Sequence, residues 1–382
     1  MMRNYCASTY IYFLLIVCFI FVFAPPGFSA GKITIEPFIE LKTRIDSNFF
    51  SRETNPQSVN TYIINPGIAL KYSIGKSMIG LDYDTKLKWE DGDNDDDHNL
   101  ALLFRTQAAD MLEFSVDNTL MKTQDPLDVD ENANATDRYR YYVNTFSPQL
   151  NYQLSEDFKL RLKYINKITD YIDDAVGEGE NSQRNEVGST LFYQMNSKTT
   201  LDLAYQHWQM DYSGTSAEYT SDQIMSNVNY KFHELALTAG AGYHSRKFDE
   251  YIASGDLERF VWKMELSGQG TKSSFNVSLK QNYNDSGETF TTSDLNVQFT
   301  YSVTDNIKGK LNGSFKNADY ENSIREDDRW SITPAVEYLV DDNFTIALET
   351  GYEERDSNTA GNNFDNEYGM IKIKYAYDAW SR

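Results

Sequence analysis

Apolar and polar residues alternate along most of this chain, in segments of about ten residues that turn-like stretches separate. The clearest segment, 158–164, reads Phe-Lys-Leu-Arg-Leu-Lys-Tyr. A period of two is that of a β-strand whose two faces meet different surroundings. Because no segment of helical period is present to cover the apolar faces, the pattern predicts a closed barrel with lipid outside and water inside.

The segments and their linkers predict the architecture in more detail. We expect an all-β chain, a transmembrane antiparallel up-and-down β-barrel of about 18 strands that begins with Ile33–Arg44 and ends with Tyr368–Tyr377. Short turns such as Ser73–Ser77 alternate with long loops such as Asp91–His98, so both termini lie at the end with the short turns. Bacterial barrels have short periplasmic turns and long extracellular loops, which places the chain in the outer membrane of a Gram-negative bacterium.

Tyrosines near the strand ends support a membrane-spanning barrel. One set closes strands before short turns and a second set precedes long loops: Tyr72, Tyr152, Tyr193, Tyr230, Tyr301 and Tyr338 in the first, and Tyr83, Tyr164, Tyr205, Tyr243, Tyr283 and Tyr352 in the second. An amphipathic ring prefers the boundary between membrane and water, so two tyrosine belts are typical of a transmembrane barrel.

The first residues are those of a secretory signal peptide. Arg3 precedes an apolar run from Ile11 to Phe23, and small residues follow it. We therefore predict a cleaved signal over 1–29 and a single barrel domain over 30–382. The two cysteines, Cys6 and Cys18, leave with the signal, so no disulfide or thiol chemistry is expected.

The chain carries a formal charge of −22, and its acidic residues concentrate in or beside the expected long loops. Acidic loops repel phosphates, so no nucleic-acid partner is expected. They suit solvation and divalent-cation bridges to lipopolysaccharide at the lipid surface. The run Asp91–Asp97 lacks the pattern of an EF-hand, so we expect no cofactor, with loose surface Ca²⁺ binding as the alternative. The acidic loop Thr123–Arg138 is expected to narrow or gate the lumen, and a disordered external loop is the alternative.

Basic residues alternate with apolar ones near the strand ends, so their side chains should face the lumen. The candidates for lining the pore are Lys71, Lys88, Arg105, Lys159, Arg161, Lys163, Lys308, Lys310, Lys372 and Lys374. Acidic residues such as Glu349 also occupy alternate strand positions whose side chains should face the lumen, so the lumen is mixed in charge. A polar lining is what any watery barrel needs, and an entrance that attracts anionic solutes is the more specific interpretation.

No pattern of catalytic residues stands out. The four histidines are His98, His207, His233 and His244, and only His244 has lumen parity within a strand. Nothing in the sequence singles out a serine as the partner of His207 or His244, and no metal-ligand spacing or glycine-rich phosphate loop is apparent. We therefore expect no catalytic or metal site and no enzyme activity.

The N-terminal region resembles a known family. The stretches Ile35-Glu-Pro-Phe-Ile-Glu-Leu-Lys-Thr-Arg-Ile-Asp-Ser-Asn-Phe-Phe50 and Tyr62-Ile-Ile-Asn-Pro-Gly-Ile-Ala-Leu70 are similar to those of outer-membrane β-barrel porins found with exopolysaccharide export systems. The resemblance implies a conduit for a secreted polysaccharide. Because no helical-repeat segment precedes the first strand, a separate periplasmic polysaccharide-export protein would dock at the short turns.

Two other roles stay open at this point. One is a general or sugar-selective diffusion porin, and the other is a structural or adhesive outer-membrane protein. The last strand alternates apolar residues up to Tyr375 and Tyr377, which resembles the signal that the outer-membrane assembly machinery reads.

Overall fold

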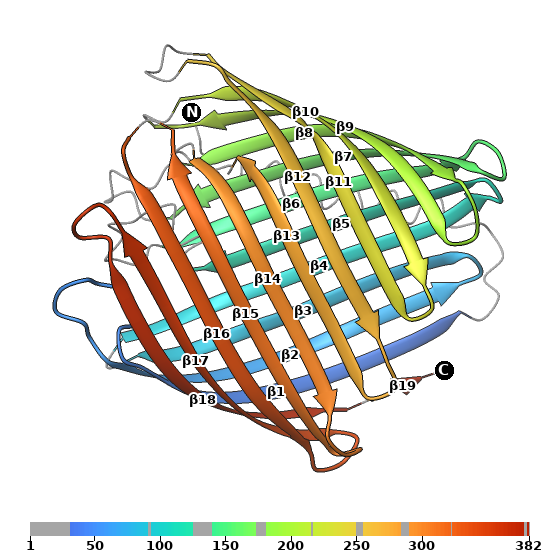
Figure 1. Ribbon diagram of the computed structural model, residues 1–382. Coiled ribbons are helices and arrows are strands. Elements are labelled where there is room, and N and C mark those ends of the chain that lie inside the picture. Colours follow the sequence, from blue (N-terminus) through green and yellow to red (C-terminus); the bar gives the residue numbers. More distant parts are fainter. Residues whose placement is uncertain are drawn as a thin grey trace.

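The computed structural model describes residues 31–90, 93–124, 140–172, 181–214, 217–249, 255–283, 290–321, 323–377 and 380–381. These residues form one antiparallel sheet that closes on itself, because β18 pairs with β1 as well as with β17. In Figure 1 the blue strand β1 lies beside the red strand β18 along this seam. Closure leaves no free sheet edge, as a bilayer demands of a spanning sheet.

The barrel has eighteen long strands and one short C-terminal strand. They are β1 (Lys32–Asp46), β2 (Val59–Ile74), β3 (Ser77–Glu90), β4 (Asp93–Ala109), β5 (Leu112–Thr123), β6 (Tyr141–Gln153), β7 (Phe158–Tyr171), β8 (Ser182–Gln194), β9 (Thr199–Tyr212), β10 (Tyr219–Phe232), β11 (Leu235–Phe248), β12 (Leu257–Gln269), β13 (Ser273–Tyr283), β14 (Phe290–Ser302), β15 (Ile307–Tyr320), β16 (Glu326–Leu339), β17 (Phe344–Ser357), β18 (Phe364–Ala376) and β19 (Trp380–Ser381). The expected all-β antiparallel barrel of 18 strands is confirmed.

The strands are longer than the alternation alone indicates. The expected loop Asp91–His98 is wrong from Asp93 on, because β4 begins there and pairs with β3 up to Glu90. Asp91 and Gly92 lie outside the described residues. The acidic run continues the ladder since pairing does not require apolar side chains once the strand has left the lipid. Similarly, β16 begins at Glu326, inside a stretch that is rich in acidic residues.

The two ends of the barrel are named here by their connections. The turn rim holds the connections 75–76, 110–111, 154–157, 195–198, 233–234, 270–272, 303–306 and 340–343, and the loop rim is the opposite end, where β1 ends at Asp46. Which rim faces the periplasm stays a prediction.

One face of every strand is apolar and exposed, as expected of a surface that contacts lipid. Examples are Leu41, Leu162, Phe260 and Leu348. The first tyrosine set lies on this outer face near the turn rim. In the second set Tyr283 departs from the expectation, because its ring is buried 5.0 Å from that of His244, a residue of the lumen face.

Two expectations fall on other parts of the chain. The signal peptide 1–29 and residues 125–139 of the loop Thr123–Arg138 lie outside the described residues. Within the described ranges, no helix has the length and apolar character needed to cross a membrane.

Candidate functional site

The strand register decides which side chains face the lumen. Lys159 lies opposite Gln153 and Phe192, whereas its neighbour Leu160 lies opposite Tyr152 and Leu191 on the outer face. Carried around the barrel, the register gives the lumen parity to every cation proposed from the sequence: Lys71, Lys88, Arg105, Lys159, Arg161, Lys163, Lys308, Lys310, Lys372 and Lys374.

Some of these cations are neutralised by carboxylates of neighbouring strands. The Lys88 Nζ atom lies 2.7 Å from Asp97, the Lys310 Nζ atom 2.6 Å from Glu337, and the Lys372 Nζ atom 2.8 Å from Glu349. Lys88 and Asp97 are buried near the loop rim, so this pair belongs to the wall itself. A cation so paired contributes little net charge to the lumen.

The cations of β7 are held differently. Lys159, Arg161 and Lys163 form a series that we call the basic ladder, and no carboxylate makes an ion pair with them in the described part of the chain. The Arg161 guanidinium lies 4.8 Å from the centre of the Phe192 ring, and its Nε donates to Asn151 Oδ1 at 3.1 Å. Asn151 in turn donates to Glu113 at 3.1 Å. The ring and the amide fix the guanidinium, so its terminal nitrogens stay available to a solute.

The four other predicted cations, Lys71, Arg105, Lys308 and Lys374, lie near the turn rim. Lys71 and Arg105 are exposed, and the Lys374 Nζ atom lies 5.0 Å from the centre of the Phe38 ring. No carboxylate pairs with them within the described residues. The turn-rim half of the lumen therefore combines paired and unpaired cations.

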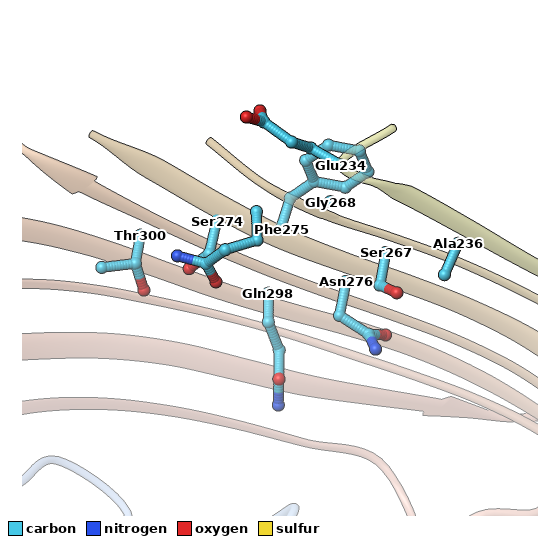
Figure 2. A pocket seen from close by; sticks show the side chains of 10 residues that line it. Glu234, Ala236, Ser267, Gly268, Ser274, Phe275, Asn276, Gln298 and Thr300 are labelled. Atoms are coloured by element: carbon cyan, nitrogen blue, oxygen red, sulfur yellow. The ribbon is translucent and has the colours of Figure 1, made fainter. Parts of the chain in front are cut away.

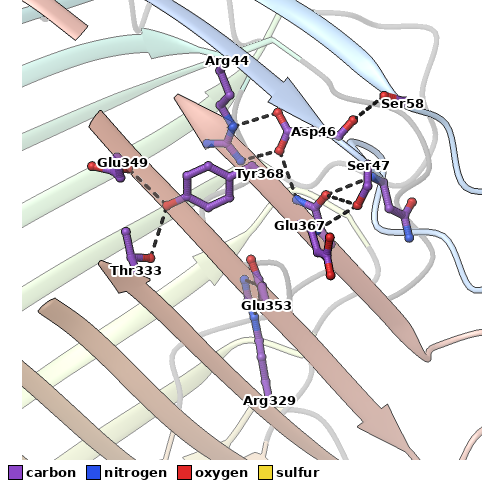
Figure 3. A network of polar contacts seen from close by, with 12 residues as sticks. Arg44, Asp46, Ser47, Ser58, Arg329, Thr333, Glu349, Glu353, Glu367 and Tyr368 are labelled. Atoms are coloured by element: carbon purple, nitrogen blue, oxygen red, sulfur yellow. Dashed lines mark hydrogen bonds and ion pairs between the residues drawn. The ribbon is translucent and has the colours of Figure 1, made fainter. Parts of the chain in front are cut away.

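Near the loop rim a polar network ties the last strand to the first. Arg44 donates through Nε and Nη2 to Asp46 at 2.7 and 2.6 Å, and Asn366 donates to the same carboxylate at 3.1 Å. The Arg44 guanidinium also lies 4.1 Å from the centre of the Tyr368 ring, whose hydroxyl donates to Glu349 at 3.2 Å. Figure 3 shows the network at the β1–β18 seam, where Arg44 and Asp46 of β1 lie beside Tyr368 of β18. Sequence reasoning missed this network, because the β1 residues and the β18 residues that it joins lie more than 300 residues apart along the chain.

A second packed region lines the loop-rim wall from β8 to β13. The Arg246 guanidinium lies 3.9 Å from the centre of the Tyr219 ring, and the His244 and Trp208 ring centres are 4.9 Å apart. His244 Nδ1 lies 2.8 Å from Asn282 Oδ1. His244 thus has the expected lumen parity but is fully buried among aromatic rings.

An open hollow of about 450 Å³ lies at the turn rim on the inner wall of β11–β14. Its lining is mostly amides, hydroxyls and small residues: Glu234, Ala236, Ser267, Gly268, Gln269, Ser274, Phe275, Asn276, Gln298 and Thr300. Figure 2 shows the Asn276 and Gln298 amides projecting to the same side, with Glu234 at the opposite edge. Within the described residues, no group of three or more His, Cys, Asp or Glu side chains is arranged to hold a metal ion.

Comparisons with known proteins agree with this architecture. Residues 239–377 match the family model described as "Putative beta-barrel porin 2". No curated protein sequence matches the chain. Among solved structures, the chain is similar to OccK2 (OpdF) of Pseudomonas aeruginosa, with a TM-score of 0.54, 9% identity and coverage of 91% of this chain and 98% of that one.

Two further solved structures are similar. OccAB2 of Acinetobacter baumannii has a TM-score of 0.54, 11% identity and coverage of 91% and 98%. OpdK of Pseudomonas aeruginosa, solved with vanillate, has a TM-score of 0.51, 11% identity and coverage of 90% and 99%. At such identities the likeness establishes the fold, which is the closed antiparallel β-barrel that the sequence predicts. The match to a porin family model agrees with the expected location in the outer membrane of a Gram-negative bacterium.

Proposed function

We propose that this barrel is a passive diffusion channel for small solutes that favours anions. The observation that carries the proposal is the basic ladder on β7. It presents Lys159, Arg161 and Lys163 to the lumen near the turn rim, and Arg161 is fixed in place by Phe192 and Asn151. A guanidinium whose position is fixed loses little conformational freedom when it contacts a carboxylate or phosphate.

The spacing of the ladder suits passage. Alternate residues of a strand lie about 7 Å apart, so an anion that leaves one cation is already within reach of the next. In water each such contact is worth about 0.6 kcal/mol at 7 Å, which enriches anions without trapping them. Paired cations such as Lys310 contribute less because Glu337 competes for them.

The comparisons support a small solute. OpdK, which shares the architecture, was solved with vanillate, a small carboxylate. The family description and the three structures described above name no polysaccharide, so the conduit that the N-terminal resemblance implies has no support from them. The diffusion channel is therefore the function that we favour over polymer export.

Ion selectivity of the purified barrel in planar bilayers tests the proposal. In a KCl gradient the reversal potential of the natural protein should indicate a preference for chloride. Arg161→Gln and Lys159→Gln should each lower the anion-to-cation permeability ratio about two- to threefold, because each removes one unpaired lumen charge. Lys76→Gln, the same change in a turn outside the lumen, is the control and should leave the ratio unchanged.

A deletion strain separates the diffusion channel from the polymer conduit. Impaired uptake of small carboxylates with normal surface polysaccharide would support the diffusion channel. Lost surface polysaccharide with normal uptake would overturn it and restore export as the function.

A further inference from the structure

The hollow on β11–β14 is lined by polar groups that are available for a ligand. Within the described residues, the side chains of Ser267, Gln298 and Thr300 make no hydrogen bond. Asn276 donates to Glu265 at 2.8 Å, which leaves its amide oxygen to accept. Several donors and acceptors that converge on one open space are what a polar ligand requires.

The lining offers no flat apolar surface. Phe275, its one aromatic residue, has the parity of the outer face, like the exposed Phe299 beside it in β14. The Phe275 ring covers Gly268, where an added Cβ atom would lie 2.4 Å from a ring carbon. The ring is therefore committed to packing on the strand, and the lining favours hydroxyl groups over aromatic or alkyl ones.

A cationic edge adjoins the hollow on β15. The register places Thr300 opposite Lys310 and Ser302 opposite Lys308. Directly opposed residues of antiparallel strands have Cβ atoms about 5 Å apart, and diagonal ones about 7–8 Å, so both ammonium groups are within reach of the hollow. Glu337 lies directly opposite Lys308 in β16 but makes its ion pair with Lys310, so the two lysines share one carboxylate and the edge keeps a net positive charge among the described residues.

The charges at the two edges of the hollow would orient a bound anion. Glu234 lies at the β11 edge and repels a carboxylate, while Lys308 attracts it at the β15 edge. A bound anion would thus point its carboxylate toward β15 and its remaining groups toward Asn276 and Gln298.

We propose that this hollow is a binding subsite for small hydroxylated carboxylates of the sugar-acid class. The inference rests on the proposed diffusion channel and names the solutes that it favours. The Lys308 ammonium receives the carboxylate, and the amides and hydroxyls of β12–β14 exchange hydrogen bonds with the hydroxyl groups. Each hydrogen bond to water-exposed groups is weak, so binding is reversible and compatible with passage.

Occlusion of single-channel current by three probes tests the subsite. Gluconate and hexanoate have the same charge and carbon number and differ in their hydroxyl groups, and glucose has the hydroxyl groups without the charge. Gluconate should interrupt the KCl current at concentrations several-fold lower than either of the others. Equal potency of gluconate and hexanoate would overturn the subsite.

Single substitutions test whether gluconate occludes the current by binding in the hollow on β11–β14. Gln298→Ala should weaken occlusion by gluconate about fivefold, the effect of one lost hydrogen bond of about 1 kcal/mol, and leave hexanoate unchanged. Lys308→Gln should weaken occlusion by both gluconate and hexanoate and leave occlusion by glucose unchanged. Gln107→Ala removes a lumen-facing amide at the turn rim of β4, on the far side of the barrel, and is the matched control.

The outcomes distinguish this inference from the proposed function. If the natural protein conducts with anion preference while Gln298→Ala and Gln107→Ala affect gluconate equally, the subsite is wrong and the channel stands. If the barrel shows no anion preference in KCl, the proposed function itself fails.

Discussion

The lumen wall near the loop rim and the wall near the turn rim use the same charged residue types in opposite ways. Near the loop rim Asp46 and Asp327 are each 1% exposed and Arg246 is fully buried, and each contacts partners within the wall. In the basic ladder near the turn rim, Lys159 and Arg161 are half-buried and Lys163 is exposed, and none of the three has a carboxylate partner in the described residues. Charged side chains of both kinds occupy lumen-facing positions of their strands. What distinguishes the structural charges from those that meet the solute is that the structural ones are buried and paired.

This difference between the loop-rim and turn-rim halves of the wall follows from the cost of burying a charge. A buried charge without a partner is costly, so loop-rim charges persist only in networks such as Arg44, Asp46 and Asn366. A charge in the wet turn-rim half keeps much of its hydration, so it can stay unpaired at little cost to stability. Substitutions should therefore reduce stability at the loop rim and change conduction at the turn rim.

The largest effect is expected at the seam of the barrel. Asp46→Ala leaves Arg44 and Asn366 without their shared acceptor and should lower the free energy of unfolding by about 3 kcal/mol. Lys159→Ala, which removes a charge from the basic ladder, should change it by less than about 0.5 kcal/mol. Urea unfolding of both variants in lipid vesicles provides the measurement, and equal losses would remove the distinction between the two halves.

A smaller effect is expected from a charge on the outer face of β7. Leu162 is 45% exposed and lies opposite Leu150, deeper in the apolar band than Leu160, which lies opposite the belt residue Tyr152. Leu162→Arg should therefore destabilise the barrel by about 2 kcal/mol, and Leu160→Arg by about 1 kcal/mol. Lys163→Glu, on the adjacent lumen position, should fold nearly as well as the natural chain. Loss of folded barrel from Lys163→Glu on unheated gels would show that the assigned parity is wrong.

The next effect concerns a proline within the lipid-facing band. Pro66 has no N–H for the carbonyl of Thr85, and the ladder between β2 and β3 is interrupted there. The Asn65 amide, in the orientation that satisfies its neighbours, donates to the Thr85 oxygen at 3.0 Å instead. Asn65→Ala should cost about 1 kcal/mol of unfolding free energy, because it leaves the Thr85 carbonyl without this donor.

A second substitution at this position tests the cause. Pro66→Ala restores the backbone donor, so it should recover most of the stability lost in Asn65→Ala. If the double variant is no more stable than Asn65→Ala alone, the amide acts by some route other than the Thr85 carbonyl.

The sequence predicts the barrel well because the alternation of lumen-facing and lipid-facing residues can be read along each strand by itself. The arrangement of the site depends in addition on how neighbouring strands are paired. Alternation alone places Lys159, Arg161 and Lys163 on one face. It cannot show that Phe192 lies beneath Arg161, since that contact depends on how β8 pairs with β7. It also places the start of β4 too late, because the charges of Asp93–His98 resemble those of a loop although the ladder continues through them.

The smallest effect is expected for an exposed ion pair at the turn rim. The Lys76 Nζ atom lies 2.9 Å from Asp110, and the hydrogen bond and charge of Lys76 hold the pKa of that carboxyl below its ordinary value. A lowered carboxyl pKa contributes stability above the ordinary value, and the contribution disappears as the pH falls through the lowered one. Asp110→Asn should thus unfold at almost the same urea concentration as the natural chain at pH 7, and any difference should shrink as the pH falls below the ordinary carboxyl pKa and in high salt. The loss in Asp46→Ala, which includes a buried group, should persist in high salt. If Asp110→Asn proves as damaging at pH 7 as Asp46→Ala, exposure does not explain why the two halves of the wall differ.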